Sequence, residues 1–150
     1  MREAIRISLE KMRSRIGGPF GAVIVRNGEI ISRGWNQVAT ARDPTAHAEI
    51  VAIRDACGAL KTFRLAGCEI YASCEPCPMC LAAIYWARLE KLYFAGTSLD
   101  AAEAGFDDAF LYQELSNPAT KRKIKTVQLL REEALVALRE WTANPNKIPY

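Results

Sequence analysis

The residues best suited to chemistry fall in two short stretches of the chain, residues 45–49 and 75–80. The first reads TAHAE and contains His47, the only histidine of the sequence. The second reads EPCPMC and places Cys77 three residues before Cys80, so one helical turn would bring both sulfurs to the same face. Imidazole and thiolate are ligands that zinc prefers. The two stretches therefore predict a zinc site made of His47, Cys77 and Cys80.

A site with one histidine and two cysteines leaves the fourth tetrahedral position open for water, as catalytic zinc sites do. Zinc lowers the pKa of a bound water to about 7, so hydroxide would form at neutral pH. Glu49 lies two residues after His47, close enough to exchange a proton with that water without binding the metal. The pattern H-x-E followed by P-C-x-x-C is the known signature of zinc enzymes that deaminate nucleobases. We therefore expect Glu49 to be the catalytic proton shuttle.

Cys74 leaves a structural alternative open, because it precedes Cys77 by the same spacing that separates Cys77 from Cys80. Four protein ligands would close the site and make it purely structural. The chain would then be a non-catalytic zinc module that mediates protein contacts, and Glu49 would be dispensable. Since Cys74 comes before Pro76, we expect it at the end of a strand and not on the helix. We interpret the remaining cysteines, Cys57 and Cys68, as packing residues of a helix and a strand.

The composition is that of one soluble globular domain: 150 residues, half of them hydrophobic and a quarter charged. A net charge of +3 is too small to argue for nucleic-acid binding by itself. No apolar stretch approaches the ~20 residues that a membrane span needs, and the N-terminus lacks the apolar core of a signal peptide. We therefore expect a cytoplasmic protein, in which five cysteines favour metal chemistry over disulfides.

Hydrophobic periodicity and turn signals divide the chain into alternating elements. Apolar runs on both sides of Asn27-Gly28 predict a hairpin, because both turn positions need a positive φ. The expected helices cover residues 2–15, 46–60 and 76–88, and a last one lies around Leu135, Leu138 and Trp141. In the first of them, the apolar stripe consists of Ile5, Leu9, Met12 and Ile16. The expected strands are 22–25, 30–31, 68–73, 91–96 and 126–129, with residues 97–116 helical or irregular and 144–150 an extended tail.

This order predicts an α/β fold of three layers, with a five-stranded mixed sheet covered by helices on both faces. The connection between the last two expected strands is long, which favours a parallel crossover. The helix over 76–88 is apolar almost all round, so we expect it to be buried, with Tyr85 and Trp86 in the core.

Three segments, 17–25, 43–49 and 73–80, resemble the cytidine deaminase-like superfamily of zinc nucleobase deaminases. More narrowly, residues 82–88 and 101–108 resemble bacterial guanine deaminases of that fold. The resemblance covers nearly the whole chain. It implies a single zinc-dependent deaminase domain over 1–150, in which the tail 144–150 closes the active site.

The resemblance implies a hydrolase that converts guanine to xanthine and ammonia with one zinc ion per subunit. The ligands would be His47, Cys77 and Cys80, with Glu49 as the proton shuttle. The substrate-binding residues would be Asn36, Asp108, Phe20, Ala48 and Tyr150. An amide such as that of Asn36 offers a donor and an acceptor to a purine edge, and the carboxylate of Asp108 accepts from guanine N–H groups. The resemblance also implies a homodimer that exchanges C-terminal segments, with no membrane and no nucleic-acid partner.

On the residues alone, other readings of the substrate-binding positions stay open. Asn36 could cap a turn, Asp108 could lie in a solvated loop, and Phe20 could belong to the core. Two related activities also compete with guanine deamination. A tRNA adenosine deaminase would use the basic run 121–125 to contact phosphate, although the acidic pair Asp107-Asp108 and the small basic excess argue against it. A cytosine deaminase would need a smaller pocket.

Overall fold

The structure is a computed structural model that describes residues 1–106 and 108–149. The chain divides into two compact units, Met1–Leu111 and Tyr112–Tyr150. The first unit contains the sheet and every residue of the site described below, and each unit is considered on its own. None of the helices in the described part of the chain is both long and apolar enough to cross a membrane.

A four-stranded mixed sheet forms the centre of the first unit. Its strands are β1 (Gly21–Arg26), β2 (Glu29–Trp35), β3 (Cys68–Cys74) and β4 (Lys91–Gly96), in the order β2-β1-β3-β4. Strand β1 pairs antiparallel with β2 and β3, whereas β3 and β4 are parallel and joined by a helical crossover. The mixed sheet is as predicted, and so is the hairpin, whose turn residues Asn27 and Gly28 have φ of 51° and 81°.

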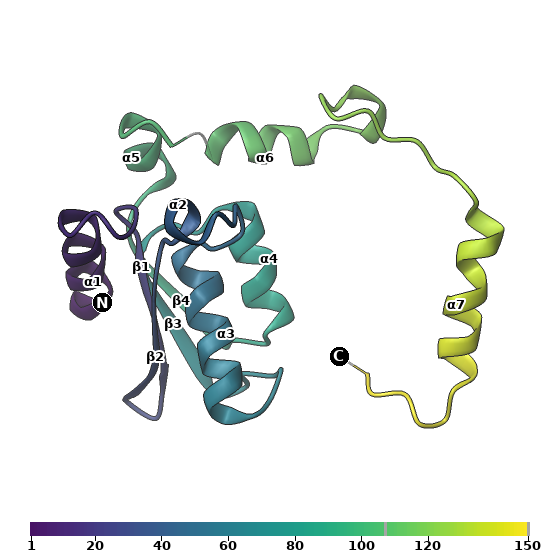
Figure 1. The fold of residues 1–150 in the computed structure, drawn as a ribbon, viewed down its shortest axis with the longest axis horizontal. Coiled ribbons are helices and arrows are strands. Elements are labelled where there is room, and N and C mark those ends of the chain that lie inside the picture. The colour runs from purple at the N-terminus through teal and green to yellow at the C-terminus, as the bar shows by residue number, and fades with distance from the viewer. Residues whose placement is uncertain (107, 150) are drawn as a thin grey trace. The chain divides into compact units, whose positions relative to one another are not determined.

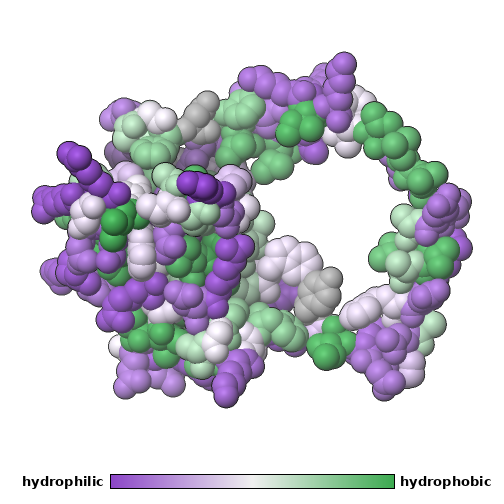
Figure 2. Space-filling model, in the orientation of Figure 1, coloured by the Kyte–Doolittle hydropathy of each residue, from purple (hydrophilic) through white to green (hydrophobic). Residues whose placement is uncertain are grey.

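The predicted fifth strand over 126–129 is wrong, and the parallel crossover expected to precede it is wrong with it. The described residues of this segment have no regular secondary structure and are exposed. Figure 2 shows the segment 124–130 as a run of hydrophobic surface, in which Val127 and Leu129 are 74% and 77% exposed. The composition is typical of a strand, but a strand exists only where a neighbour supplies the hydrogen-bond ladder.

Helices cover both faces of the sheet in the first unit. The helices of this unit are α1 (Arg2–Arg13), α2 (Val38–Ala41), α3 (Ala48–Leu60), α4 (Pro78–Trp86) and α5 (Ser98–Glu103), and α6 (Asp108–Ser116) begins in it. Helix α1 lies on one face, and α3 and α4 lie on the other (Figure 1). The three-layer arrangement predicted from the sequence is therefore observed. The second unit holds a short 3-10 turn (Ala119–Lys121) and α7 (Arg131–Ala143), and none of its described residues is buried.

Helix α1 is present as predicted, but it turns a different face to the sheet. The buried side chains are those of Ala4, Ile7 and Ser8. The side chains of the predicted apolar stripe, Ile5, Leu9, Met12 and Ile16, are each about 40% exposed. The reason is the close approach of the helix backbone to β1. A Cβ on Gly21 would lie 2.3 Å from the carbonyl oxygen of Ala4, so the absence of a side chain at position 21 lets the backbone of α1 lie directly against β1 at Ala4 and Ser8.

Helix α4 is apolar but not buried, contrary to expectation. Only Cys80 and Ile84 are buried, while Tyr85 and Trp86 are 72% and 62% exposed. The apolar sequence of α4 would allow the helix to be buried on every side. In the structure, only the side that faces the sheet is covered.

The core between the sheet and α3 fixes the start of that helix. Ile24, Ile70 and Ala52 are fully buried there. Gly34 of β2 lets α3 approach closely, because a Cβ at this position would lie 2.1 Å from the carbonyl oxygen of Ala48. The first turn of α3, which follows His47, therefore rests directly on the sheet.

Candidate metal and substrate site

Two helix N-termini bring the predicted metal ligands together. His47 is the N-cap residue of α3 and Cys77 is the N-cap residue of α4, with Cys80 one turn further along. Neither N-cap side chain makes a capping hydrogen bond. The backbone N–H groups of the first helical turns favour negative charge, which suits thiolate ligands.

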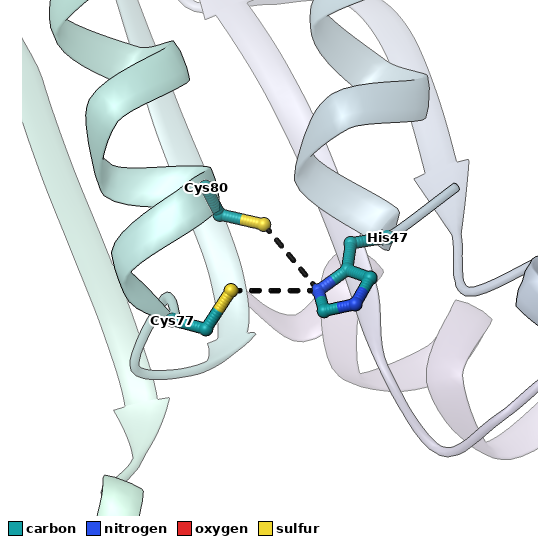
Figure 3. Close-up of side chains that lie close together, drawn as sticks. All are labelled: His47, Cys77 and Cys80. Atoms are coloured by element: carbon teal, nitrogen blue, oxygen red, sulfur yellow. Dashed lines mark hydrogen bonds between the residues drawn. The ribbon is translucent and has the colours of Figure 1, made fainter. Parts of the chain in front are cut away.

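The three side chains converge on one point. Nδ1 of His47 lies 3.6 Å from Sγ of Cys77 and 3.5 Å from Sγ of Cys80, and Figure 3 shows both sulfurs directed at that nitrogen. The three donor atoms lie within 4.8 Å of one another. Tetrahedral zinc with bonds of about 2.0–2.1 Å to nitrogen and about 2.3 Å to sulfur would separate these atoms by about 3.6 Å. The donor set and its spacing therefore fit zinc.

Cys74 is at the last position of β3, as predicted, and it lies outside the metal-ligating group found among the described residues. Its thiol donates to the carbonyl oxygen of Thr97 at 3.4 Å. The structure thus brings together three protein ligands and not the four of the closed alternative.

The electrostatics of the group favour a negatively charged sulfur. The pKa of Cys77 is lowered to about 4, chiefly because the thiol of Cys80 hydrogen-bonds to its sulfur. The same hydrogen bond raises the pKa of Cys80, and the interaction with Cys77 raises the pKa of His47. One sulfur of the pair is therefore held as the thiolate that a metal requires.

Glu49 lies in the first turn of α3 beside this group and is buried, with 7% of its surface exposed. Burial raises the pKa of its carboxyl above the ordinary range, because the charged form loses its hydration. The carboxyl also interacts with the thiol of Cys80. A carboxyl whose pKa is raised holds a proton more readily than an exposed one, which suits a general acid and base.

A cavity of about 480 Å³ opens in front of the metal-ligating group, which is a size typical of sites for small molecules. Of the residues predicted to form the site, those that line it are Phe20, Asn36, His47, Ala48, Glu49, Cys77 and Asp108. Cys80 is not among the residues that line the cavity but belongs to the metal-ligating group, and Tyr150 lies outside the described residues.

Asn36 is held at the cavity by the glycine segment before β1. The N–H of Gly18 donates to the carbonyl oxygen of Asn36, and the N–H of Asn36 donates to the carbonyl oxygen of Phe20, each at 3.1 Å. The Oδ1 of Asn36 accepts from the N–H of Val38 at 3.3 Å, so the residue does cap a turn. It also faces the cavity, and the two roles coexist.

Sequence reasoning assigned no role to several other residues of the cavity wall. They are Arg15, Gly17, Gly18, Val38, Ala39, Thr40, Glu75 and Phe106. Phe106 packs edge-to-face on Phe20, with ring centroids 4.7 Å apart. Glu75 and Phe106 lie within the segments 73–80 and 101–108 that resemble known deaminases, so the sequence offered a reason to place them at the site. Arg15 and residues 38–40 carry no such signal.

The zinc-binding region of cytidine and deoxycytidylate deaminases matches residues 1–96 of this chain. The chain belongs to this family. The guanine deaminase of Bacillus subtilis is 49% identical over 150 residues, which cover all of this chain and 96% of the relative. The X-ray structure of guanine deaminase from Bacillus subtilis superposes with a TM-score of 0.96 at 50% identity, covering 99% of this chain and 95% of that one. The tRNA-specific adenosine deaminase of Aquifex aeolicus is 42% identical over 123 residues, which cover 82% of this chain and 79% of the relative.

The comparisons confirm three predictions from the sequence: the resemblance to bacterial guanine deaminases, the deaminase fold and its zinc-binding character. His47, Cys77 and Cys80 are the metal-ligating group that the structure offers to this family's zinc.

Proposed function

We propose that the chain hydrolyses guanine to xanthine and ammonia. One observation carries the proposal: Glu49, Asp108 and two members of the metal-ligating group, His47 and Cys77, line a single cavity. The relative that matches over the whole chain is a guanine deaminase, which supports the choice of substrate.

His47, Cys77 and Cys80 would hold the zinc ion. When bound, zinc supplies this chemistry with a water that is acidic enough to attack at neutral pH. The protein's part is to place the carbon that bears the amino group in front of that water and to move protons. The cavity wall and Glu49 perform these two tasks.

Glu49 is the proton carrier of the proposed reaction. Its carboxylate takes a proton from the attacking water and delivers it to the ring nitrogen next to C2 of guanine. The oxygen of that water bonds to C2, and Glu49 then takes the proton that remains on this oxygen and transfers it to the amino group. The C–N bond breaks, ammonia leaves, and the oxygen stays on C2 as the carbonyl of xanthine. Burial raises the pKa of Glu49, which makes its carboxyl a better proton acceptor than an exposed carboxylate and so supports this role.

Asp108, Asn36 and Phe20 would orient the base. Guanine presents ring N–H donors, which the carboxylate of Asp108 can accept, and the amide of Asn36 can donate and accept along the purine edge. Phe20 with Phe106 offers an apolar border for the ring. Ala48 lies at the same wall, where it is too small to obstruct a planar ring.

The second unit supports a further part of the proposal, a homodimer that exchanges C-terminal segments. The described residues 112–149 include none that is buried, although the unit contains Ile124, Leu129, Leu130 and Leu138 with 61% or more of each exposed. Such a segment gains stability only by covering apolar surface elsewhere. In the first unit, β4 is the last strand of the sheet, and the side chain of its Phe94 is 44% exposed.

We further propose one deaminase domain per chain, with the tail 144–150 closing the active site, and a cytoplasmic location that keeps the cysteines reduced. Light scattering coupled to size-exclusion chromatography tests the dimer. A monomer at micromolar concentration would contradict that part.

The test of function is turnover by the purified zinc-loaded protein, followed by ultraviolet absorbance and ammonia release. The substrates are guanine, adenine, cytosine, their nucleosides and an adenosine-containing tRNA anticodon stem-loop. We expect turnover of guanine alone, and Asp108→Asn should reduce it while the matched exposed variant Asp55→Asn does not.

Turnover of the stem-loop would favour the alternative function, a tRNA adenosine deaminase. Two observations support that alternative: the similarity to the Aquifex aeolicus relative and the exposed basic run 121–125. Turnover of cytosine would refute the assignment of Asp108. Inactivity on every substrate would favour the non-catalytic zinc module.

A further inference from the structure

Three hydrogen bonds join the end of β3 to one segment of the chain, residues 96–98. The N–H of Glu75 donates to the carbonyl oxygen of Gly96 at 2.8 Å. The Oε2 of Glu75 accepts from the N–H of Ser98 at 2.8 Å. Between them, the thiol of Cys74 donates to the carbonyl oxygen of Thr97. Two adjacent residues thus hold three consecutive backbone groups.

The bond from Glu75 to Ser98 joins the two sides of the cavity. Glu75 precedes Cys77 by two residues, so it belongs to the loop that carries a metal ligand. Ser98 is the first residue of α5, and the chain leaves α5 towards Phe106 and Asp108 on the cavity wall. All of these residues belong to the unit Met1–Leu111.

The start of α5 is well defined, which makes it a firm attachment point. Thr97 and Asp100 form a capping box, in which each side chain bonds the backbone N–H of the other residue. That box satisfies the N–H groups of Thr97 and Asp100, and Glu75 satisfies the N–H of Ser98. Removing the carboxylate of Glu75 would leave this N–H without its acceptor and free α5 to shift.

We propose that Glu75 is a positioning residue that fixes Phe106 and Asp108 relative to the metal-ligating loop. It thereby sets the affinity and selectivity for the base, while proton transfer by Glu49 does not depend on it. The inference rests on the proposed guanine deaminase function for its kinetic test, but the positioning itself can be measured without any substrate.

The kinetic test compares three variants of the zinc-loaded enzyme. Glu75→Ala removes the acceptor, and Glu75→Gln keeps a carbonyl oxygen that can accept from Ser98. Glu90→Ala is the matched control, because Glu90 also accepts from a backbone N–H, that of Gly67, at 3.1 Å and away from the cavity. We expect Glu75→Ala to raise KM for guanine about tenfold with kcat within threefold and zinc content unchanged.

We expect Glu75→Gln to restore KM to within threefold of the parent value, and Glu90→Ala to leave KM unchanged. An unchanged KM in Glu75→Ala would refute the proposal, and so would an equal rise in Glu90→Ala. A Glu75→Gln variant as impaired as Glu75→Ala would also refute it, because the charge of Glu75 would then act on the substrate directly.

Amide hydrogen exchange of the zinc-loaded protein tests the positioning without substrate. Peptides that cover residues 97–106 should exchange at least fivefold faster in Glu75→Ala than in the parent, and at the parent rate in Glu75→Gln and Glu90→Ala. Unchanged exchange in Glu75→Ala would overturn the inference. If the parent protein fails to deaminate guanine, the proposed function falls, and the exchange data still decide the role of Glu75.

Discussion

The contact between Gly34 of β2 and the backbone of α3 links the packing of the core to the geometry of the proposed active site. A Cβ placed on Gly34 would lie 2.1 Å from the carbonyl oxygen of Ala48 and 2.6 Å from the backbone nitrogen of Ala52. Both atoms belong to the backbone of α3, which cannot turn aside as a flexible side chain would. For the shorter contact to reach 3.0 Å, the helix must retreat by about 1 Å.

The cost of Gly34→Ala follows from that displacement. Overpacking of this kind costs about 1–3 kcal/mol of unfolding free energy. His47 and Glu49 move with α3, whereas Cys77 and Cys80 belong to α4, so the distances of 3.5 and 3.6 Å across the site would change. A misplacement of about 1 Å at a reacting centre can cost ~10²-fold in rate. We expect kcat/KM for guanine to fall by about that factor in the folded fraction.

The matched control is Gly58→Ala, on the same helix. A Cβ at Gly58 meets nothing within 4 Å, so alanine should stabilise the helix by about 0.5–1 kcal/mol and leave activity unchanged. Urea unfolding and steady-state kinetics measure both effects. If Gly34→Ala keeps its stability within 0.5 kcal/mol and its kcat/KM within threefold, then the close approach of β2 and α3 does not position the site as argued.

Three further predictions concern single side chains. Glu49→Gln should keep stoichiometric zinc but lose ~10²–10⁴-fold in kcat, because the amide cannot carry a proton; normal turnover would remove Glu49 from the mechanism. Cys80→Ala should lose zinc by metal analysis, since two ligands remain; full zinc content would show that the site lies elsewhere. Hydrogen bonds from Arg6 and then Arg33 lower the pKa of Glu3 from 4.5 to about 2, so its contribution to stability is present above pH 4.5 and disappears as the pH falls towards 2. Glu3→Gln should therefore lose about 0.5–1 kcal/mol at pH 7 in urea unfolding, with the difference shrinking below pH 4.5, and a pH-independent difference would contradict this.

The sequence was most informative where a local physical requirement dictates the residue type. Asn27-Gly28 predicted the hairpin because its turn needs positive φ at both positions, and the structure has them. The helix that follows His47 and the spacing of Cys77 and Cys80 were likewise readable, because one helical turn fixes the relation between the two sulfurs.

The sequence was least informative where the outcome depends on what lies across a contact. The apolar face of α1 gave no sign that Ala4 and Ser8 would face β1, because the closeness of that contact comes from Gly21 on another element. The segment 126–129 has the composition of a strand but no ladder partner among the described residues of its own unit. The hydrogen bond from Ser98 to Glu75 joins residues 23 positions apart, beyond any local pattern.

The N-cap positions of α3 and α4 carry His47 and Cys77, which make no capping hydrogen bond. Serine, threonine, aspartate or asparagine at an N-cap stabilises a helix by about 0.5–2 kcal/mol relative to a residue that does not cap. Both α3 and α4 therefore lack the stabilisation of a capping side chain, because the two N-cap positions hold residues of the metal-ligating group. Selection for thermal tolerance alone would favour polar caps at both positions and would abolish the site, so an engineered stabilised form has to take its gains elsewhere.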